Sequence, residues 1–558
     1  MSDTPVTPLA ELTGPQTVAG EAANRELGGD SDISFVSLNR WDFLLLASGI
    51  ASVLSYCILI SPKKLFWADE ITTWVIITDP SASHMVNAVA HAVDGALPCY
   101  FLLARVWALF FGATELPLRL FASIGFCIAL AVTWVTVRRC YSLLPTAFGL
   151  LTVWCMSSLM LLQSTEARNY GLLVATFAIA VGNFCVLVER RELSRRLLIA
   201  TFFTHAILVW SHLYGILYGG AILAALIVWD LSRRQLRLKA YAAMIAGWLT
   251  LTPYARAIAR ILALGKPHGW RVAPDFPELL DAYSFGIPLW PVAVLAAIIA
   301  AGVFLSHKDV CREQTSRSSA VSGQGALLLL GVAVMAIPLL CFVLAQWSTT
   351  LFNQRYFLPA SIGLGFLLTH LVETNTAMWG LKGAWARAMT VCCALLLGCM
   401  MVLPVVTALH ASPAEASGFR YVDTLIPPGM PVILEDMHMF LSLSYFTGRR
   451  DRPYFYVLDW PLASQARSPQ SAALCHNTMR AWKQNGYWSD RIIDSQELLC
   501  RGQRFMVIDS PDTLPWYQAH VAGNPAFNSR LVQYLDQRHA LVVVERRPAV
   551  EVEGCINQ

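Results

Sequence analysis

Two adjacent carboxylates, Asp69 and Glu70, follow the first long apolar segment of the chain in the sequence Trp67-Ala68-Asp69-Glu70. A polar, helix-breaking stretch comes after them, so the pair lies in a connector at the end of that segment. A carboxylate beside a substrate can remove a proton from a hydroxyl or an amine during group transfer. The pair is therefore a candidate active site at the mouth of a membrane protein, with simple loop solvation as the alternative.

Three further polar sets lie at the ends of apolar segments, at residues 91–100, 163–170 and 353–359. Ionisable groups near membrane segments cost free energy unless they are paired or wet, which makes such sets functional candidates. Guanidinium groups bind phosphate through two hydrogen bonds, and this favours Arg168 and Arg355 as contacts of an anionic leaving group. Two structural alternatives remain: Glu166 and Arg168 as an ion pair on one helical turn, and Arg355 as an interfacial anchor beside Tyr356.

The composition indicates which elements must position these groups. Apolar residues make up 56% of the chain, charged residues 14%, and the mean hydropathy is +0.51. Soluble domains carry about 25% charged residues. Apolar runs close to the ~20 residues of a helical span recur from about Phe43 to Leu409, which predicts a polytopic α-helical membrane protein. The net charge of +4, without a basic block, argues against a nucleic acid partner.

Basic connectors set the expected orientation, because Lys and Arg collect in cytoplasmic loops. They lie at residues 138–139, 189–196, 233–239, 308–317 and 382–387. The poorly charged turns at 212–215, 260–287 and 347–355 then face outward, as does the chain after the last apolar segment at about 386–408. Asp69 and all three polar sets share this outer face, with His91, Tyr170 and His212 as further site-lining candidates.

One conflict concerns the number of crossings between Asp69 and Arg138. Asp69 is expected on the outer side and Arg138 on the cytoplasmic side, so the chain must cross the membrane an odd number of times between them. Two apolar segments lie there, however, at about Leu97–Phe111 and Leu120–Val137. We expect the first, which is short and contains Arg105, to be re-entrant or interfacial, which leaves eleven crossings. Alternatively both segments cross and Arg138 departs from the charge rule, so about 11–13 spans are expected.

Four basic residues fall on the outer side against the charge rule: Arg256, Arg260, Lys266 and Arg271. An anionic lipid head group would compensate them, so Lys266 and Arg271 are weaker candidates for phosphate contacts. The alternative is that they snorkel to the phosphates of the outer leaflet.

The chain divides into three expected parts. Residues 1–40 are polar and read as a disordered cytoplasmic tail; residues 41–410 form the transmembrane domain, with a first outer loop at 62–96; residues 411–558 form an extracytoplasmic soluble domain. In the last part, β-rich runs at 431–435, 454–458, 505–509 and 541–545 alternate with helical patterns at about 465–483 and 528–537. This predicts a small α/β domain, in which Cys475 and Cys500 could pair.

No cofactor is expected. His91, His212 and His268 could ligate a divalent metal together with Asp69 or Glu166. Scattered histidines without HxxxH spacing are more often plain polar contacts, so metal binding remains a minor alternative.

The motifs together resemble the GT-C superfamily of integral-membrane glycosyltransferases. The likeness covers residues 40 to 410 and rests on Asp69-Glu70, Leu97-Pro98-Cys99-Tyr100, the turn from Gly112 to Arg119, the Glu-Ala-Arg-Asn-Tyr box at 166–170 and the Arg-Tyr-Phe-Leu-Pro box at 355–359. Within the superfamily it is most similar to the protein mannosyltransferase-like (family 39-like) proteins, which use polyprenyl-phosphate sugars. Asp94-Gly95-Ala96-Leu97-Pro98 departs from the His-Pro-Pro-Leu of many members.

The resemblance implies a cell-membrane hexosyl- or pentosyltransferase that moves a sugar from a polyprenyl-phosphate donor to a glycan, lipid or protein acceptor on the extracytoplasmic face. Asp69 matches the family's first-loop acid and is the expected base, with Glu70 and Glu166 as alternatives. Arg168, Arg355 and the neighbouring Tyr356 would contact the lipid phosphate. A polytopic transporter or lipid flippase is the alternative function, and an inactive scaffold or receptor is a third.

Overall fold

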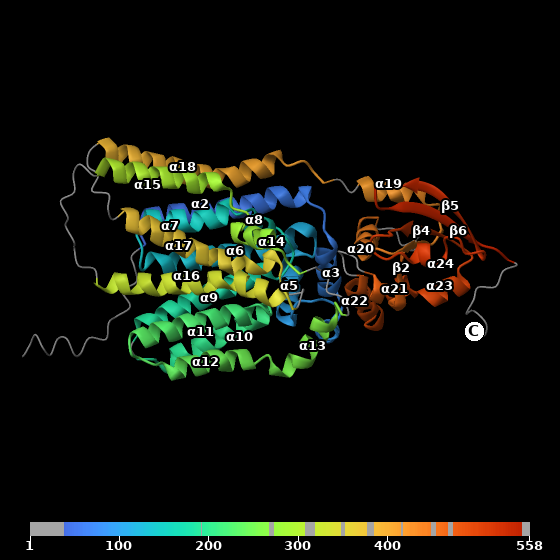
Figure 1. Ribbon diagram of the computed structural model, residues 1–558, viewed down its shortest axis with the longest axis horizontal. Coiled ribbons are helices and arrows are strands. Elements are labelled where there is room, and N and C mark those ends of the chain that lie inside the picture. Colours follow the sequence, from blue (N-terminus) through green and yellow to red (C-terminus); the bar gives the residue numbers. More distant parts are fainter. Residues whose placement is uncertain are drawn as a thin grey trace, which may run out of the picture. The chain divides into compact units, whose positions relative to one another are not determined.

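The computed structural model describes residues 38–190, 192–266, 273–306, 318–347, 352–376, 384–414, 417–447, 454–466 and 472–548. Most of the expected tail at 1–40, together with His268 and Arg271, lies outside these ranges. The helices up to residue 410, coloured from blue to orange in Figure 1, are α2 (Arg40–Ile60), α3 (Ala68–Ile77), α4 (Ala82–Ala90), α5 (Pro98–Phe111), α6 (Glu115–Arg138), α7 (Leu143–Leu151), η2 (Thr152–Met156), α8 (Ser158–Ser164), α9 (Tyr170–Glu189), α10 (Arg195–Ser211), α11 (Gly215–Ser232), α12 (Leu238–Leu249), α13 (Ala255–Ala263), α14 (Phe276–Ser284), α15 (Leu289–Ser306), α16 (Ser318–Ala345), η5 (Gln354–Phe357), α17 (Leu358–Thr376) and α18 (Ala384–His410).

The protein is a multi-pass membrane protein. Within the described residues, seven helices are long and apolar enough to cross a bilayer, and nine spans result if two bent helix pairs each count as one. This is fewer than the eleven to thirteen that we expected. One reason is length, because α10 has 17 residues and α12 has 12.

Helix α5 is short, as the sequence predicted. Its 14 residues rise about 21 Å at about 1.5 Å per residue, which is less than the ~30 Å of the hydrocarbon core. In the described chain between Asp69 and Arg138, α6 is therefore the one helix that reaches the length of a span. With α6 as the single crossing in this stretch, the number of crossings between Asp69 and Arg138 is odd, and α5 does not span the membrane.

An ion pair joins the first and second long helices at one end. Asp42, near the start of α2, is fully buried and accepts hydrogen bonds from Arg138 Nε at 2.5 Å and Trp134 Nε1 at 3.2 Å. Arg138 is the last residue of α6, so the start of α2 and the end of α6 lie together. Asp69, which follows α2, accordingly belongs to the opposite end of these helices.

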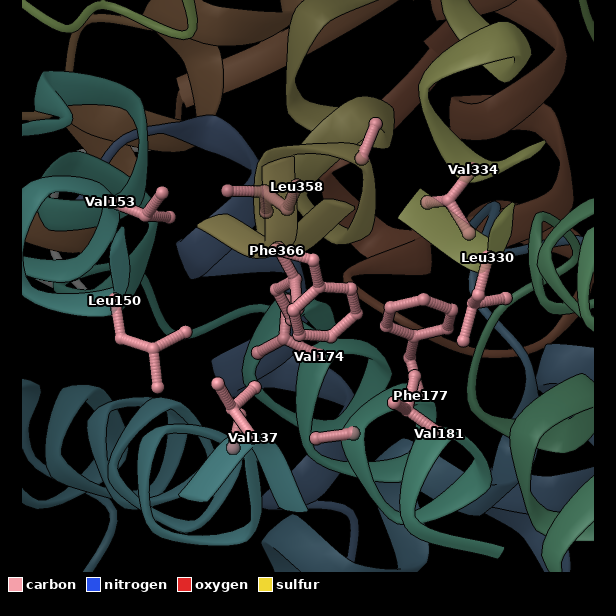
Figure 2. Close-up of a cluster of buried hydrophobic side chains, with 14 of the residues drawn as sticks. Val137, Leu150, Val153, Val174, Phe177, Val181, Leu330, Val334, Leu358 and Phe366 are labelled. Atoms are coloured by element: carbon pink, nitrogen blue, oxygen red, sulfur yellow. The ribbon is translucent and has the colours of Figure 1, made fainter. Parts of the chain in front are cut away.

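Close packing of α6 against α9 fixes the start of α9, where the side chains of Arg168 and Tyr170 lie. A Cβ added to Gly125 of α6 would come within 2.4 Å of the Gly171 carbonyl oxygen, and one added to Gly171 within 2.2 Å of the Ala122 carbonyl oxygen. Small residues let membrane helices approach in this way. Figure 2 shows a buried apolar core shared by α6, α7, η2, α9, α16 and α17, with Phe177 and Phe366 near its middle.

The C-terminal region is a small α/β domain, as expected. Its helices are α19 (Ser417–Leu425), α20 (Met437–Phe446), α21 (Trp460–Gln465), α22 (Ala472–Gln484), α23 (Ser495–Arg501) and α24 (Trp516–His520), and its strands are β1 (Val432–Leu434), β2 (Tyr454–Leu458), β3 (Ile492–Asp494), β4 (Arg504–Asp509), β5 (Phe527–Tyr534) and β6 (Ala540–Arg546). The sheet order is β3-β2-β1-β4-β6-β5, with β1 to β4 parallel to one another and β6 antiparallel to both of its neighbours, β4 and β5.

Alternate residues of the strands enter different cores. Val432 and Leu434 of β1 pack with α20 and α22, whereas Ile433 packs with α23 and α24 on the other face. The first of these cores continues into α3 and α5. The sheet is therefore covered on both faces, which explains the continuous apolar runs of its strands.

The predicted helix at residues 528–537 is wrong, because this segment forms β5 and the turn that leads to β6. Strand β5 lies at the edge of the sheet, and most of its side chains are exposed. An edge strand with polar side chains lacks the apolar alternation by which strands are recognised. Pairing with β6, and not the local pattern, decides its conformation.

The disulfide that Cys475 and Cys500 could have formed is absent. Cys475 is buried in α22 and is not disulfide-bonded. Cys500, at the end of α23, is disulfide-bonded.

Candidate functional site

Asp69 lies between two guanidinium groups at the start of α3. Its Oδ2 is 3.1 Å from Arg355 Nη1 and 4.0 Å from Arg168 Nε, and its backbone carbonyl accepts a hydrogen bond from Arg168 Nη1 at 3.2 Å. The Asp69 side chain keeps 26% of its surface exposed. Three residues from distant parts of the chain thus converge, as the sequence predicted, and the carboxylate between them remains accessible.

Arg168 is held from its other side by Asp94. Its Nη1 donates to Asp94 Oδ2 at 2.9 Å and to Thr73 Oγ1 at 3.3 Å. Asp94 is itself oriented by the backbone N–H of Ala96 at 2.7 Å. Because Asp94 is 6% exposed and the Arg168 side chain 10% exposed, this pair is a rigid support for the guanidinium.

Aromatic rings surround Arg355. Its guanidinium carbon lies 5.4 Å from the ring centroid of Trp67, 5.9 Å from that of Tyr170 and 5.8 Å from that of Tyr356. Such cation–π contacts favour a guanidinium over an ammonium because the planar group also stacks. Tyr170 and Tyr356, both named from the sequence, therefore lie at the site and help to fix the direction of Arg355.

Three buried N–H donors around Asp69 have no hydrogen-bond partner among the described residues. They are Trp67 Nε1, Arg168 Nε and Arg355 Nε. A buried donor without a partner costs about 1–3 kcal/mol. An oxygen-rich anion bound between the two guanidinium groups would offset that cost.

Glu70 is occupied by an internal ion pair. It has no exposed surface, and its two oxygens accept hydrogen bonds from Arg119 Nε at 2.9 Å and Arg119 Nη2 at 2.8 Å. The backbone N–H groups of Ala167 (2.9 Å) and Trp67 (3.4 Å) also donate to it. Glu70 therefore fastens α3 to α6 and to the loop that carries Arg168, and it has no surface open to a substrate.

Glu166 pairs with Lys64. The distance from Lys64 Nζ to Glu166 Oε1 is 3.1 Å, while Glu166 Oε2 is buried without a hydrogen-bond partner. Burial raises the pKa of Glu166, and the charge of Lys64 opposes that change. The structural alternative, an ion pair of Glu166 with Arg168, is not formed, because Arg168 pairs with Asp94 and Asp69.

The electrostatic balance keeps Asp69 ionised. Burial acts to raise its pKa, but the positive charges of Arg168, Arg355 and His438 together outweigh this effect, so the pKa of Asp69 is lowered from its ordinary value. Asp69 is therefore a carboxylate at neutral pH, as a general base must be before it accepts a proton.

His212 and His91 differ in their relation to this cluster. The His212 ring lies 5.4 Å from that of Tyr356 and 6.0 Å from that of Tyr170, and desolvation lowers the pKa of His212 to about 3. It is thus a neutral group that lines the site, and its Nδ1 accepts from the Tyr214 N–H at 3.0 Å. His91 is exposed at the end of α4, where its Nδ1 is 2.8 Å from the Asn87 carbonyl oxygen.

The predicted outer basic residues are not part of the described cluster. Lys266 is exposed just after α13, and no hydrogen bond or ion pair joins its side chain to the described site residues. Arg271 lies outside the described residues. Within the ranges that the structure describes, no group of three or more His, Cys, Asp or Glu side chains is arranged to hold a metal ion.

The sequence did not assign four of the groups that build the site: Lys64, Asp94, Arg119 and His438. Asp94 and Arg119 were noticed within motifs, but no local pattern identifies their partners. Lys64 follows the first apolar segment and had no recognised role. His438 comes from the C-terminal domain, far from Asp69 along the chain, and its positive charge is among the causes that lower the pKa of Asp69.

Comparisons with known proteins bear on the fold. No family model and no curated protein matches the sequence. Several solved structures are similar to it, among them two of ArnT. One is ArnT from Cupriavidus metallidurans in the apo state, with 14% identity, a TM-score of 0.57, and 90% of this chain and 97% of that chain covered. The other is ArnT from the same organism bound to undecaprenyl phosphate, with 14% identity, a TM-score of 0.55, and coverage of 90% and 98%. The chain therefore shares its fold with ArnT, a polytopic helical membrane domain followed by an α/β domain.

Proposed function

We propose that this protein is a membrane glycosyltransferase that moves a sugar from a polyprenyl-phosphate donor to an acceptor on the extracytoplasmic face. The observation that carries the proposal is the accessible Asp69 carboxylate between Arg168 and Arg355, with unpartnered buried donors beside it. A base and a cationic phosphate site side by side are what sugar transfer from a phosphate requires.

In the proposed reaction, an acceptor hydroxyl or amine attacks the anomeric carbon of the donor. The bond between that carbon and the phosphate oxygen breaks, the acceptor proton passes to Asp69, and the lipid phosphate leaves as an anion beside Arg355 and Arg168. Arg355 Nη1 donates to Asp69 in the absence of ligand. A donor phosphate that takes over Arg355 would loosen this contact and make Asp69 a stronger base when the donor is bound.

The donor class is supported by the fold, since one of the similar solved structures is ArnT bound to undecaprenyl phosphate. The narrower likeness to protein mannosyltransferases, a hexosyl or pentosyl group as the transferred sugar, and a glycan, lipid or protein as the acceptor remain predictions. Lys266 and Arg271 remain predicted as weaker contacts of the lipid phosphate, and Arg271 lies outside the described residues.

We place the transmembrane catalytic domain at 41–410 and the soluble domain at 411–558, in the inner membrane with the soluble domain outside. The disulfide-bonded Cys500 in that domain supports this side, because disulfides persist in oxidising compartments. A transporter is less well supported, since the ion pairs of the site lie at the start of α3 and in the segments before α9 and before α17, and not in the middle of spans.

The proposal is tested by Asp69→Asn, which removes the base and preserves its shape. With the purified protein in lipid nanodiscs and a panel of polyprenyl-phosphate sugars, we expect transfer to fall about 10² to 10⁴-fold. Binding of undecaprenyl phosphate should persist. Asp536→Asn, at an exposed turn between β5 and β6, is the matched control. Wild-type turnover in Asp69→Asn would exclude Asp69 from the chemistry.

A further inference from the structure

A cavity of about 390 Å³ lies in the C-terminal domain, beside α21 and α22, which are neighbours in Figure 1. It is lined by Leu458, the last residue of β2, and by Asp494, the last residue of β3. Sites for small molecules occupy about 300 to 1,000 Å³, and open α/β sheets bind ligands outside the carboxyl ends of their strands. The α22 cavity, as we call it, therefore has the size and the position of a ligand site, and none of its lining residues belongs to the Asp69 cluster.

Helix α22 uses one face for the membrane domain and another for this cavity. The first face is buried in the apolar core shared with α3 and α5, where Trp482 Nε1 donates to the Val93 carbonyl oxygen at 2.9 Å. The second face presents residues at intervals of four and three, which places them one above another on a helix. These residues line the cavity: His476, Arg480 and Lys483. A ligand in the cavity would thus be held by the same helix that packs on the membrane domain.

The α22 cavity has one more positive than negative side chain. Lys483 Nζ forms an ion pair with Asp494 Oδ2. Arg480 is exposed, and within the part of the chain that the structure describes no carboxylate pairs with it. A guanidinium binds the oxyanion of a phosphate or a carboxylate through two parallel hydrogen bonds. Arg480 therefore favours an anionic ligand.

An aromatic ring and a buried polar atom complete the lining. Trp460 keeps 40% of its surface exposed, and its ring centroid lies 5.2 Å from that of His476. His476 is 4% exposed, and its Nδ1 is buried without a hydrogen-bond partner among the described residues. A buried polar atom without a partner costs free energy, which a ligand that reaches it would offset.

These two groups together suit a sugar. Burial lowers the pKa of His476, so its ring is neutral at neutral pH and has one donor and one acceptor nitrogen. A sugar hydroxyl can pair with either nitrogen, because it both donates and accepts. The apolar face of Trp460 can pack on the C–H groups of a sugar ring.

We propose that the α22 cavity binds an acidic saccharide, with its oxyanion on Arg480 and Lys483, its ring on Trp460 and a hydroxyl at His476. This inference deepens the proposed function and rests on it in one respect: the acidic saccharide is then part of the acceptor, which the soluble domain captures. Phosphate and carboxylate groups share the required chemistry, and the choice of probes distinguishes them.

The test is a titration of the full-length protein in phosphatidylcholine nanodiscs, followed by saturation-transfer NMR of the probe. The probes are glucose 6-phosphate, glucuronate, uncharged glucose and inorganic phosphate. At least one of the two acidic sugars should bind about tenfold more tightly than glucose, and Arg480→Gln should remove this advantage. Tighter binding of glucose 6-phosphate identifies a phosphosugar, and tighter binding of glucuronate a uronic acid.

Two further variants locate the sugar. Trp460→Leu should weaken binding of the acidic sugar about three- to tenfold and leave binding of inorganic phosphate unchanged. Arg355→Gln should leave the affinity for the acidic sugar unchanged, because Arg355 belongs to the Asp69 cluster. The matched control is Arg501→Gln, since Arg501 of α23 is exposed, pairs with Glu497 at 3.0 Å and does not line the cavity.

Equal affinity for glucose and both acidic sugars, or wild-type affinity in Arg480→Gln, would overturn the inference. A loss of binding in Arg355→Gln without a loss in Arg480→Gln would also overturn it, because the probe would then occupy the Asp69 cluster. The measurement needs no turnover, so the two proposals fail separately. If acidic sugars bind at Arg480 but no polyprenyl-phosphate sugar is transferred, the reaction proposal fails and the binding site stands; if transfer occurs and no acidic sugar binds, the binding site fails.

Discussion

Glu70→Gln distinguishes the two adjacent carboxylates most sharply. The structure assigns Asp69 to an accessible position and Glu70 to a closed one, although they are neighbours in the sequence. The substitution replaces one oxygen of Glu70 by an NH2 group and removes its charge. That group would then face donors, because Arg119 and the backbone N–H groups of Ala167 and Trp67 all point at the two oxygens.

The expected magnitude follows from burial. Both Glu70 and Arg119 have side chains with no exposed surface. Removing one partner of a buried ion pair leaves the other charge uncompensated and costs about 3–5 kcal/mol in folding free energy. Arg119 also donates to the carbonyl oxygens of Ser61, Lys64 and Leu65. These bonds retain part of its stabilisation, so we expect the lower half of that range.

The assay is thermal unfolding of the purified protein in nanodiscs, followed by transfer measured well below the unfolding midpoint. Glu70→Gln should lower the midpoint by several degrees, while Asp69→Asn should leave it almost unchanged and abolish transfer. Because Glu70 also fastens the loop of Arg168, a modest loss of activity in Glu70→Gln is compatible with its structural role. Wild-type stability in Glu70→Gln, combined with a loss of transfer equal to that of Asp69→Asn, would refute the assignment and make Glu70 the base.

Three further predictions follow from the site and the topology. Arg355→Lys should weaken binding of a polyprenyl-phosphate analogue about 10- to 100-fold, because an ammonium keeps the charge but loses a charged hydrogen bond worth about 1.5–3 kcal/mol; near-normal affinity in a titration would remove Arg355 from the phosphate site. Reporters fused after residue 235 or 312 should read cytoplasmic and one fused after residue 420 external; a cytoplasmic signal at 420 would overturn the orientation. Transfer should persist after EDTA treatment, and activity that is lost with EDTA and restored by a divalent cation would contradict the expectation of no metal cofactor.

The sequence by itself determined the class of protein and the main members of the site. Apolar runs near span length lead to helices in a bilayer, because only there can every backbone group be paired without water. The basic connectors then placed Asp69, Arg168 and Arg355 on one face. The three side chains meet in the structure because they share this face and because a charged side chain without a partner near the membrane costs free energy.

Only the tertiary structure decided which partner each charge takes. Glu70 and Asp69 look alike in sequence, yet the close approach of α3 to α6 gives one to Arg119 and leaves the other accessible. Glu166 pairs with Lys64 and not with Arg168, since Asp94 is closer to the guanidinium. Strand β5 forms because β6 pairs with it. These outcomes depend on contacts between distant segments, and no local pattern of residue types carries that information.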